Sequence, residues 1–107
     1  MNITKRQPVT VGEMLTEEFM EPIRLTQAEL AKQMGVSRKT VNELCTNKRS
    51  ITAETALMLA TVFANTPDFW LNIQQRNDIW NVLHSKKRVE RVRKARPLTV
   101  KRKRVTI

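Results

Sequence analysis

Residues 25–49 constrain the fold most, because they predict two short helices joined by one tight turn. Thr26, followed three positions later by Glu29, forms a capping box, in which each side chain accepts a hydrogen bond from the other residue's backbone amide. Gly35 allows the left-handed backbone that ends a helix and turns the chain sharply. Ser37 is suited to cap a second helix. The segment therefore predicts a helix-turn-helix.

The second of these helices has two unlike faces. Its inward face holds three apolar side chains at spacings of three and four residues, namely Val41, Leu44 and Cys45. Four polar side chains remain on the outward face: Arg38, Lys39, Asn42 and Glu43. A helix that enters the major groove of DNA needs this division, since an apolar side must hold it and polar side chains must contact base edges. We therefore expect the segment to bind DNA.

The net charge of the chain, +10, is concentrated at one end. Residues 1–85 hold nine lysines and arginines against nine acidic residues, whereas residues 86–107 hold eleven against Glu90 alone. A neutral body with a basic arm is typical of DNA-binding proteins. The alternative is a solvated tail that only adds solubility.

A length of 107 residues is that of one small domain. We divide it into an N-terminal arm at 1–11, a helix-turn-helix domain at 12–85 and a basic tail at 86–107. The single cysteine, Cys45, excludes an internal disulfide framework and fits a reducing cytoplasm. No apolar run approaches the roughly 20 residues of a membrane span, and the arm lacks the apolar stretch of a secretion signal. We expect a cytoplasmic protein with no membrane partner.

Three further helices are predicted around the helix-turn-helix. The first covers about 12–21, because Pro22 disfavours helical backbone in the residue before it. Another begins with Thr52 as its cap and continues to about residue 64. A third begins with Thr66 as its cap and Pro67 at its first position. Connections this short leave no room for a sheet, so we expect an all-α fold of five helices.

Helical spacing also predicts which side chains of these three helices face the core. The expected inward positions are, helix by helix, Leu15 and Phe19, then Ala56, Leu57, Ala60 and Phe63, then Phe69, Ile73, Trp80 and Leu83. Trp70 and Trp80 have two interpretations, as core residues or as part of a contact between two copies of the chain.

The sequence after Leu83 allows more than one structure. Residues 84–96 could extend the last helix, with Val89 and Val92 as its only apolar anchors, and Pro97 would stop that extension. Residues 98–107 alternate loosely between apolar and polar side chains. They could form a short strand that pairs only with a partner, or stay disordered.

No catalytic or metal-binding pattern is present in the sequence. His84 is the only histidine and has no second histidine or cysteine near it. Cys45, on the inner side of its helix, is expected to be a small buried apolar residue rather than a nucleophile. Two glycines, Gly12 and Gly35, are too few for a glycine-rich phosphate loop. We expect no enzymatic activity, cofactor or metal.

Four segments together resemble the HigA-type antitoxins, also called virulence-associated protein I proteins. They are residues 11–22, 25–38, 47–52 and 65–74, and the resemblance covers about residues 9–83. The helix-turn-helix alone is typical of the wider Cro/repressor-like class, whereas Thr-Pro-Asp-Phe-Trp-Leu-Asn at 66–72 narrows the family. The resemblance implies a five-helix Cro-like fold. It also implies a homodimer that binds a palindromic operator and represses an operon shared with a RelE-like, mRNA-cleaving HigB toxin, which the antitoxin neutralises.

Residue roles follow from the same resemblance by position in the motif. Gln27 would contact a phosphate, Arg38, Lys39 and Asn42 would face bases, and Thr46, Asn47 and Lys48 would contact the DNA backbone. The complete expected DNA-binding set is Gln27, Ser37, Arg38, Lys39, Thr40, Asn42, Glu43, Thr46, Asn47, Lys48 and Arg49.

Two protein contacts are also expected. The dimer contact is assigned to Ile79, Trp80 and Leu83, together with the tail. Because RelE-like toxins are basic, the toxin contact is assigned to the acidic first helix, with Glu13, Glu17, Glu18 and Glu21; the alternative is a solvated face. A stand-alone transcription regulator without a toxin remains the second functional hypothesis. A general nucleic-acid-binding protein that depends on its tail is the third.

Overall fold

Residues 6–99 are described by the computed structural model, and within them every regular element is helical. The elements are α1 (Val11–Glu13), the π-helical η1 (Met14–Met20), the 3-10 helix η2 (Glu21–Ile23), α2 (Gln27–Met34), α3 (Arg38–Cys45), α4 (Ala53–Phe63), α5 (Pro67–Leu83) and α6 (Lys86–Arg93). The all-α fold class is confirmed. The proposed strand at 98–107 falls mostly outside the described residues, and the described residues 98 and 99 are not in a strand.

The first helical stretch is longer and less regular than expected. Thr10 caps it by accepting a hydrogen bond of 3.1 Å from the amide of Glu13, and α1, η1 and η2 then follow without a break. The expected end at Glu21 is wrong, because Pro22 lies in the first turn of η2, where its missing amide is not needed. Arg24, in the left-handed region at φ 52°, ends the stretch.

The helix-turn-helix has the caps that the sequence predicts. Thr26 and Glu29 exchange hydrogen bonds of 3.1 and 3.0 Å at the start of α2. Gly35 ends α2 with φ 77°. The hydroxyl of Ser37 accepts a hydrogen bond of 3.1 Å from the amide of Thr40 and so starts α3. Local chemistry alone thus determines where α2 ends and α3 begins.

One expected core position on α4 is wrong. Leu57 is 56% exposed, whereas Leu59 is completely buried beside Ala56 and Ala60. The inward face of α4 follows the spacing of Ala56, Leu59, Ala60 and Phe63, and a residue directly after Ala56 is rotated away from that face.

An aromatic cluster joins η1, α4 and α5. The ring centroids of Phe19 and Trp70 are 4.9 Å apart, and those of Phe69 and Trp70 are 5.0 Å apart. Trp70 is completely buried, and its Nε1 donates a hydrogen bond of 3.0 Å to Asn65 Oδ1. Trp70 is therefore a core residue and is not part of a dimer contact, whereas Trp80 stays half-buried.

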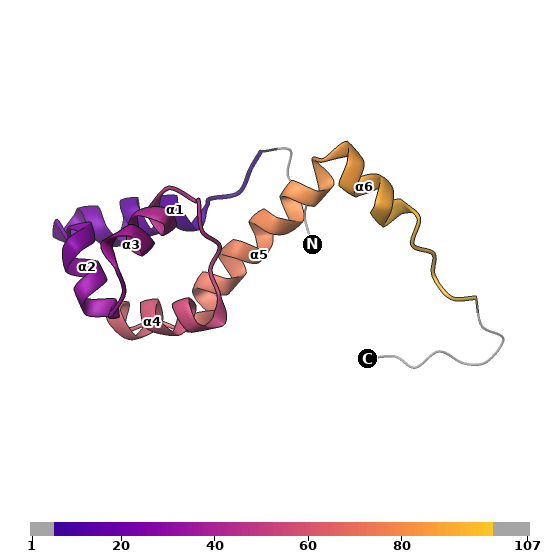
Figure 1. Ribbon diagram of the computed structural model, residues 1–107. Helices are drawn as coiled ribbons and strands as arrows, with labels where there is room; N and C mark the ends of the chain where they lie inside the picture. Colours follow the sequence, from indigo (N-terminus) through magenta and orange to yellow (C-terminus); the bar gives the residue numbers. More distant parts are fainter. Residues whose placement is uncertain (1–5, 100–107) are drawn as a thin grey trace.

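The end of α5 extends away from the body of the molecule, and α6 continues beyond that end at an angle to α5 (Figure 1). Residues 84–96 do not extend α5, because α5 ends at Leu83 with His84 as its cap. Ser85 then caps a new helix by accepting a hydrogen bond from the Arg88 amide. The His84 ring instead stacks on Trp80, with centroids 4.0 Å apart. The described residues thus form α6 in addition to the five expected helical regions.

The N-terminal segment before α1 lies along α5, held by one buried amide. The Nδ2 of Asn77 donates to the carbonyl of Val9 at 2.6 Å and to that of Ile73 at 3.1 Å. Its Oδ1 accepts a hydrogen bond of 3.2 Å from Gln7. Asn77 therefore connects α5 to the segment that leads into α1.

Candidate nucleic-acid interface

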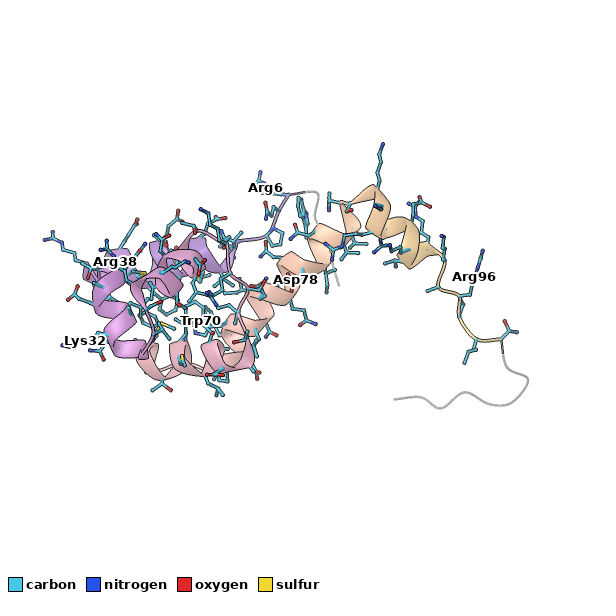
Figure 2. The ribbon with its side chains drawn as sticks, viewed as in Figure 1. Arg6, Lys32, Arg38, Trp70, Asp78 and Arg96 are labelled. Carbon is cyan, nitrogen blue, oxygen red and sulfur yellow. The ribbon has the colours of Figure 1, made fainter. Side chains whose placement is uncertain are left out.

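Helix α3 presents one polar face to solvent and buries the other. Val41 and Leu44 are completely buried, and Cys45 is half-buried. Arg38, Lys39 and Asn42 are exposed on the opposite face, while Thr40 and Glu43 are half-buried. Figure 2 shows Arg38 at the end of the molecule that is farthest from Arg96. The division of faces that the sequence predicts is present.

A hydrogen bond joins the expected phosphate contact to an expected base contact. The Nδ2 of Asn42 donates to Gln27 Oε1 at 3.2 Å, so the first turn of α2 and the middle of α3 meet at the surface. One hydrogen of the Asn42 amide remains for another acceptor. Gln27 thereby fixes the direction in which the Asn42 side chain points.

The turn after α3 is held against α1 by Asn47. Its backbone is left-handed, at φ 60°. Its Oδ1 accepts a hydrogen bond of 2.9 Å from the Gly12 amide, and its Nδ2 donates one of 3.0 Å to Thr10 Oγ1. Gly12 permits this approach, because an added Cβ would lie 2.9 Å from the carbonyl carbon of Cys45 and closer still to its oxygen. Sequence reasoning did not find this structural role of Asn47, since nothing local connects residues 12 and 47.

Arg49 and Glu43 form an ion pair beside this turn. Arg49 donates to Glu43 Oε1 from Nη2 at 2.7 Å and from Nε at 3.2 Å. These hydrogen bonds lower the pKa of Glu43 below its ordinary value. The pair occupies two side chains of the expected DNA-binding set. The cations left without an ion pair on this surface, within the described residues, include Arg38, Lys39 and Lys48.

The remaining side chains of the expected set lie on the same surface. Thr46 is exposed at the end of α3 and donates from Oγ1 to the Asn42 carbonyl at 2.8 Å. Ser37 and Thr40 are linked through their hydroxyl oxygens at 2.9 Å. The structure therefore brings the whole set together around α3, with several of its members bonded to each other.

The residues expected to contact proteins lie elsewhere. Ile79, Trp80 and Leu83 are half-buried on the part of α5 that extends from the body. The acidic residues Glu13, Glu17, Glu18 and Glu21 are all exposed along α1, η1 and η2. The dimer set thus lies on the end of α5, whereas the acidic set meets the DNA-binding set at Thr10, which bonds both Glu13 and Asn47.

The described residues hold no cluster of histidine, cysteine and carboxylate side chains that could bind a metal ion. Burial raises the pKa of Cys45, whose thiol contacts Met20 Sδ at 3.8 Å. Such a thiol is a poor nucleophile, because the thiolate is the reactive form. Over the same residues, no helix has the length and apolar character needed to cross a membrane.

Comparison with known proteins places this geometry in a family. A model of the helix-turn-helix family matches residues 17–70. Antitoxin HigA-1 of Vibrio cholerae serotype O1 is 52% identical over 81 residues, which are 76% of each chain. An uncharacterized helix-turn-helix transcriptional regulator of Haemophilus influenzae is 46% identical over 82 residues, or 77% of each chain.

A solved structure matches the fold over most of its length. It is the Pseudomonas aeruginosa antitoxin HigA with the higBA promoter, at a TM-score of 0.75 and 28% sequence identity. The match covers 86% of this chain and 99% of that one.

The structural role of Asn47 can be tested by two substitutions. Asn47→Gly removes two hydrogen bonds but keeps the left-handed backbone, and should lower the free energy of unfolding by about 1–3 kcal/mol. Asn47→Ala loses the same hydrogen bonds but keeps a Cβ in the left-handed backbone, so it should be about 1–2 kcal/mol less stable than the glycine variant. Denaturant unfolding measures both, with Asn72→Ala on the exposed side of α5 as the control. Wild-type stability in both variants would refute the role.

Proposed function

Because this chain belongs to the helix-turn-helix family and, within it, to the HigA-type antitoxins, we propose that it is a sequence-specific DNA-binding antitoxin that represses its own operon. The observation that carries the proposal is the surface of α3. Arg38, Lys39 and Asn42 are exposed there, opposite the fully buried Val41 and Leu44. A helix held in this way can enter the major groove with its polar side chains directed at the bases.

Each exposed side chain has a matching partner in DNA. Arg38 can donate two hydrogen bonds to O6 and N7 of guanine. Asn42 can accept from N6 of adenine and donate to N7 with the amide hydrogen that Gln27 does not use. Gln27, in the first turn of α2, and Lys48, after α3, are suited to phosphate oxygens, and Thr46 becomes so when its hydroxyl leaves the Asn42 carbonyl. Gln27 would then both contact the backbone and orient Asn42.

The base contact of Arg38 can be tested against a matched control. A guanine contact by arginine contributes about 1–3 kcal/mol of discrimination, so Arg38→Ala should relax the preference at one position in each half-site. Arg76→Ala removes the same charge from the exposed side of α5 and should leave the preference unchanged. Gln27→Ala should weaken binding to all sequences. Selection of binding sites with each variant measures this, and an unchanged consensus for Arg38→Ala would refute the contact.

We infer that the active form is a homodimer, because one helix-turn-helix contacts too few base pairs for useful specificity. The expected contact surface is Ile79, Trp80 and Leu83, which the body of the same chain covers only in part. Two chains joined through the extended ends of α5 would each hold one α3 for one half-site. The operator would then be a palindrome.

The dimer contact is tested by placing a charge in it. Leu83→Asp removes one buried apolar side chain from each chain, and each loss lowers the free energy of association by about 1.5 kcal/mol or more. The dissociation constant of the dimer should therefore rise at least about a hundredfold. Asn81→Asp adds the same charge at a neighbouring exposed position and should not change the dimer. Sedimentation measures both. A wild-type protein that stays monomeric at micromolar concentration would contradict the proposal.

We infer that the acidic surface formed by Glu13, Glu17, Glu18 and Glu21 binds a basic RelE-like toxin. These carboxylates are exposed and belong to no ion pair among the described residues. Glu17, Glu18 and Glu21 belong to η1 and η2, whereas Glu13 adjoins the DNA-binding set through Thr10, which bonds both Glu13 and Asn47. The alternative is a transcription regulator with no toxin, and the relative in Haemophilus influenzae is named only as an uncharacterized helix-turn-helix transcriptional regulator.

The toxin contact is tested in two steps. The neighbouring reading frame should encode a short, basic, RelE-like protein, and its absence would favour the stand-alone regulator. With that protein in hand, Glu17→Gln with Glu18→Gln should slow association and weaken the complex by about tenfold. The control, Glu54→Gln with Asp68→Asn, removes the same charge from α4 and α5 and should leave the affinity for the toxin unchanged. Equal affinity of both double variants for the toxin would exclude the acidic surface.

A further inference from the structure

Helix α6 carries more charge than its own surroundings can balance. Of its eight residues five are lysine or arginine, and the only ion pair formed there within the described residues joins Arg93 to Glu90 at 3.5 Å. No residue of α6 is fully buried. Like charges on one helix destabilise it, and cations in its first turn oppose the helix dipole. A helix of this kind is suited to bind a polyanion, whose negative charges would neutralise its unpaired lysines and arginines.

The charges of α6 are arranged by face. One row of cations lies along the helix, because spacings of four and three residues place Lys87, Arg91 and Lys94 on the same face. Val89, which is half-buried, and Val92 occupy the opposite side. The row of three cations is exposed throughout. It extends over about 10 Å at 1.5 Å per residue.

We propose that α6 is a second DNA-binding element, in which Lys87, Arg91 and Lys94 bind backbone phosphates. The proposal rests on the proposed binding of operator DNA by α3, since that binding would hold the same chain, and α6 with it, on the duplex. Linked contacts of this kind raise the affinity without any change in sequence preference.

The position of α6 makes its contacts additional to those of α3. The molecule extends 58 Å along its longest axis, with α2 and α3 at one end and α6 beyond the far end of α5 (Figure 1). B-DNA rises 3.4 Å per base pair, so the full length, which includes residues 94–99 beyond α6, corresponds to about 17 base pairs. Phosphates bound by α6 are therefore not those beside the bases that α3 of the same chain contacts.

The full-length protein tests this proposal with two triple variants of equal charge. The first variant is Lys87→Gln, Arg91→Gln and Lys94→Gln, which removes the row. The second is Lys86→Gln, Arg88→Gln and Arg93→Gln, which removes three cations from the rest of the same helix. Glutamine preserves helix propensity in both. The affinity for a long duplex centred on the operator is then measured at several salt concentrations.

The first variant should lower the slope of log affinity against log salt by about 2.7 per chain, at about 0.9 for each lost phosphate contact. The second should lower it by less than about 1, and both should keep the operator preference. Hydroxyl-radical footprints of the first variant should lose protected positions outside the α3 contacts. A wild-type slope in the first variant, or an equal loss in both, would overturn the proposal.

A charge-preserving variant separates charge from structure. Lys87→Arg, Arg91→Lys and Lys94→Arg should keep the wild-type slope, and a loss there as well would overturn the proposal. Failure of the proposed function has a different signature, because the wild-type protein would then bind operator and unrelated duplexes equally. Binding of the wild type to RNA in preference to the duplex would also contradict the assignment to DNA.

Discussion

Val41 and Leu44 hold α3 against the rest of the molecule, and both side chains are completely buried. The helix has only eight residues, whereas isolated helices below about 12–15 residues are marginal in water. Its shape and direction therefore depend on packing and not on helix propensity. The polar side chains on its outward face, Arg38, Lys39 and Asn42, depend on these contacts for their position. The Asn47 amide, bonded to Gly12 and Thr10, fixes the turn that follows.

Positive charge is distributed unevenly between the body of the chain and its C-terminal part. Residues 1–85 carry equal numbers of basic and acidic side chains, and the excess of ten positive charges belongs to residues 86–107. Around α3, part of the charge is balanced internally, as in the pair of Arg49 and Glu43. On α6 most of it is not. This distribution agrees with our proposals that α3 determines sequence preference and that α6 contributes salt-dependent affinity.

Local signals predicted much of the fold from sequence. The caps at Thr26, Ser37, Thr52 and Thr66 depend only on residues three positions away, and each forms as expected. The break between α5 and α6 was not predicted, although Ser85 is a similar cap, because a continuous helix also fitted the apolar spacing. Leu57 was assigned to the wrong face, since periodicity alone did not show where the inward stripe of a largely apolar helix lies.

Contacts between distant residues of the site could not be predicted at all. Asn47 bonds to residues 35 and 37 positions away, and Asn77 bonds to residues 68 and 70 positions away. No local pattern encodes such pairs, because they exist only once the helices have packed. The polar face of α3 was predictable for the opposite reason, since three- and four-residue spacing places it by helix geometry.

The most direct test of the central claim is selection of binding sites by the wild-type protein from a pool of random duplexes. The account predicts enrichment of one palindrome, whose half-sites lie one helical turn, about 10 base pairs, apart. It also predicts that this palindrome occurs upstream of the protein's own gene. A pool that stays random after repeated selection would contradict the assignment of α3 as a helix that recognises sequence.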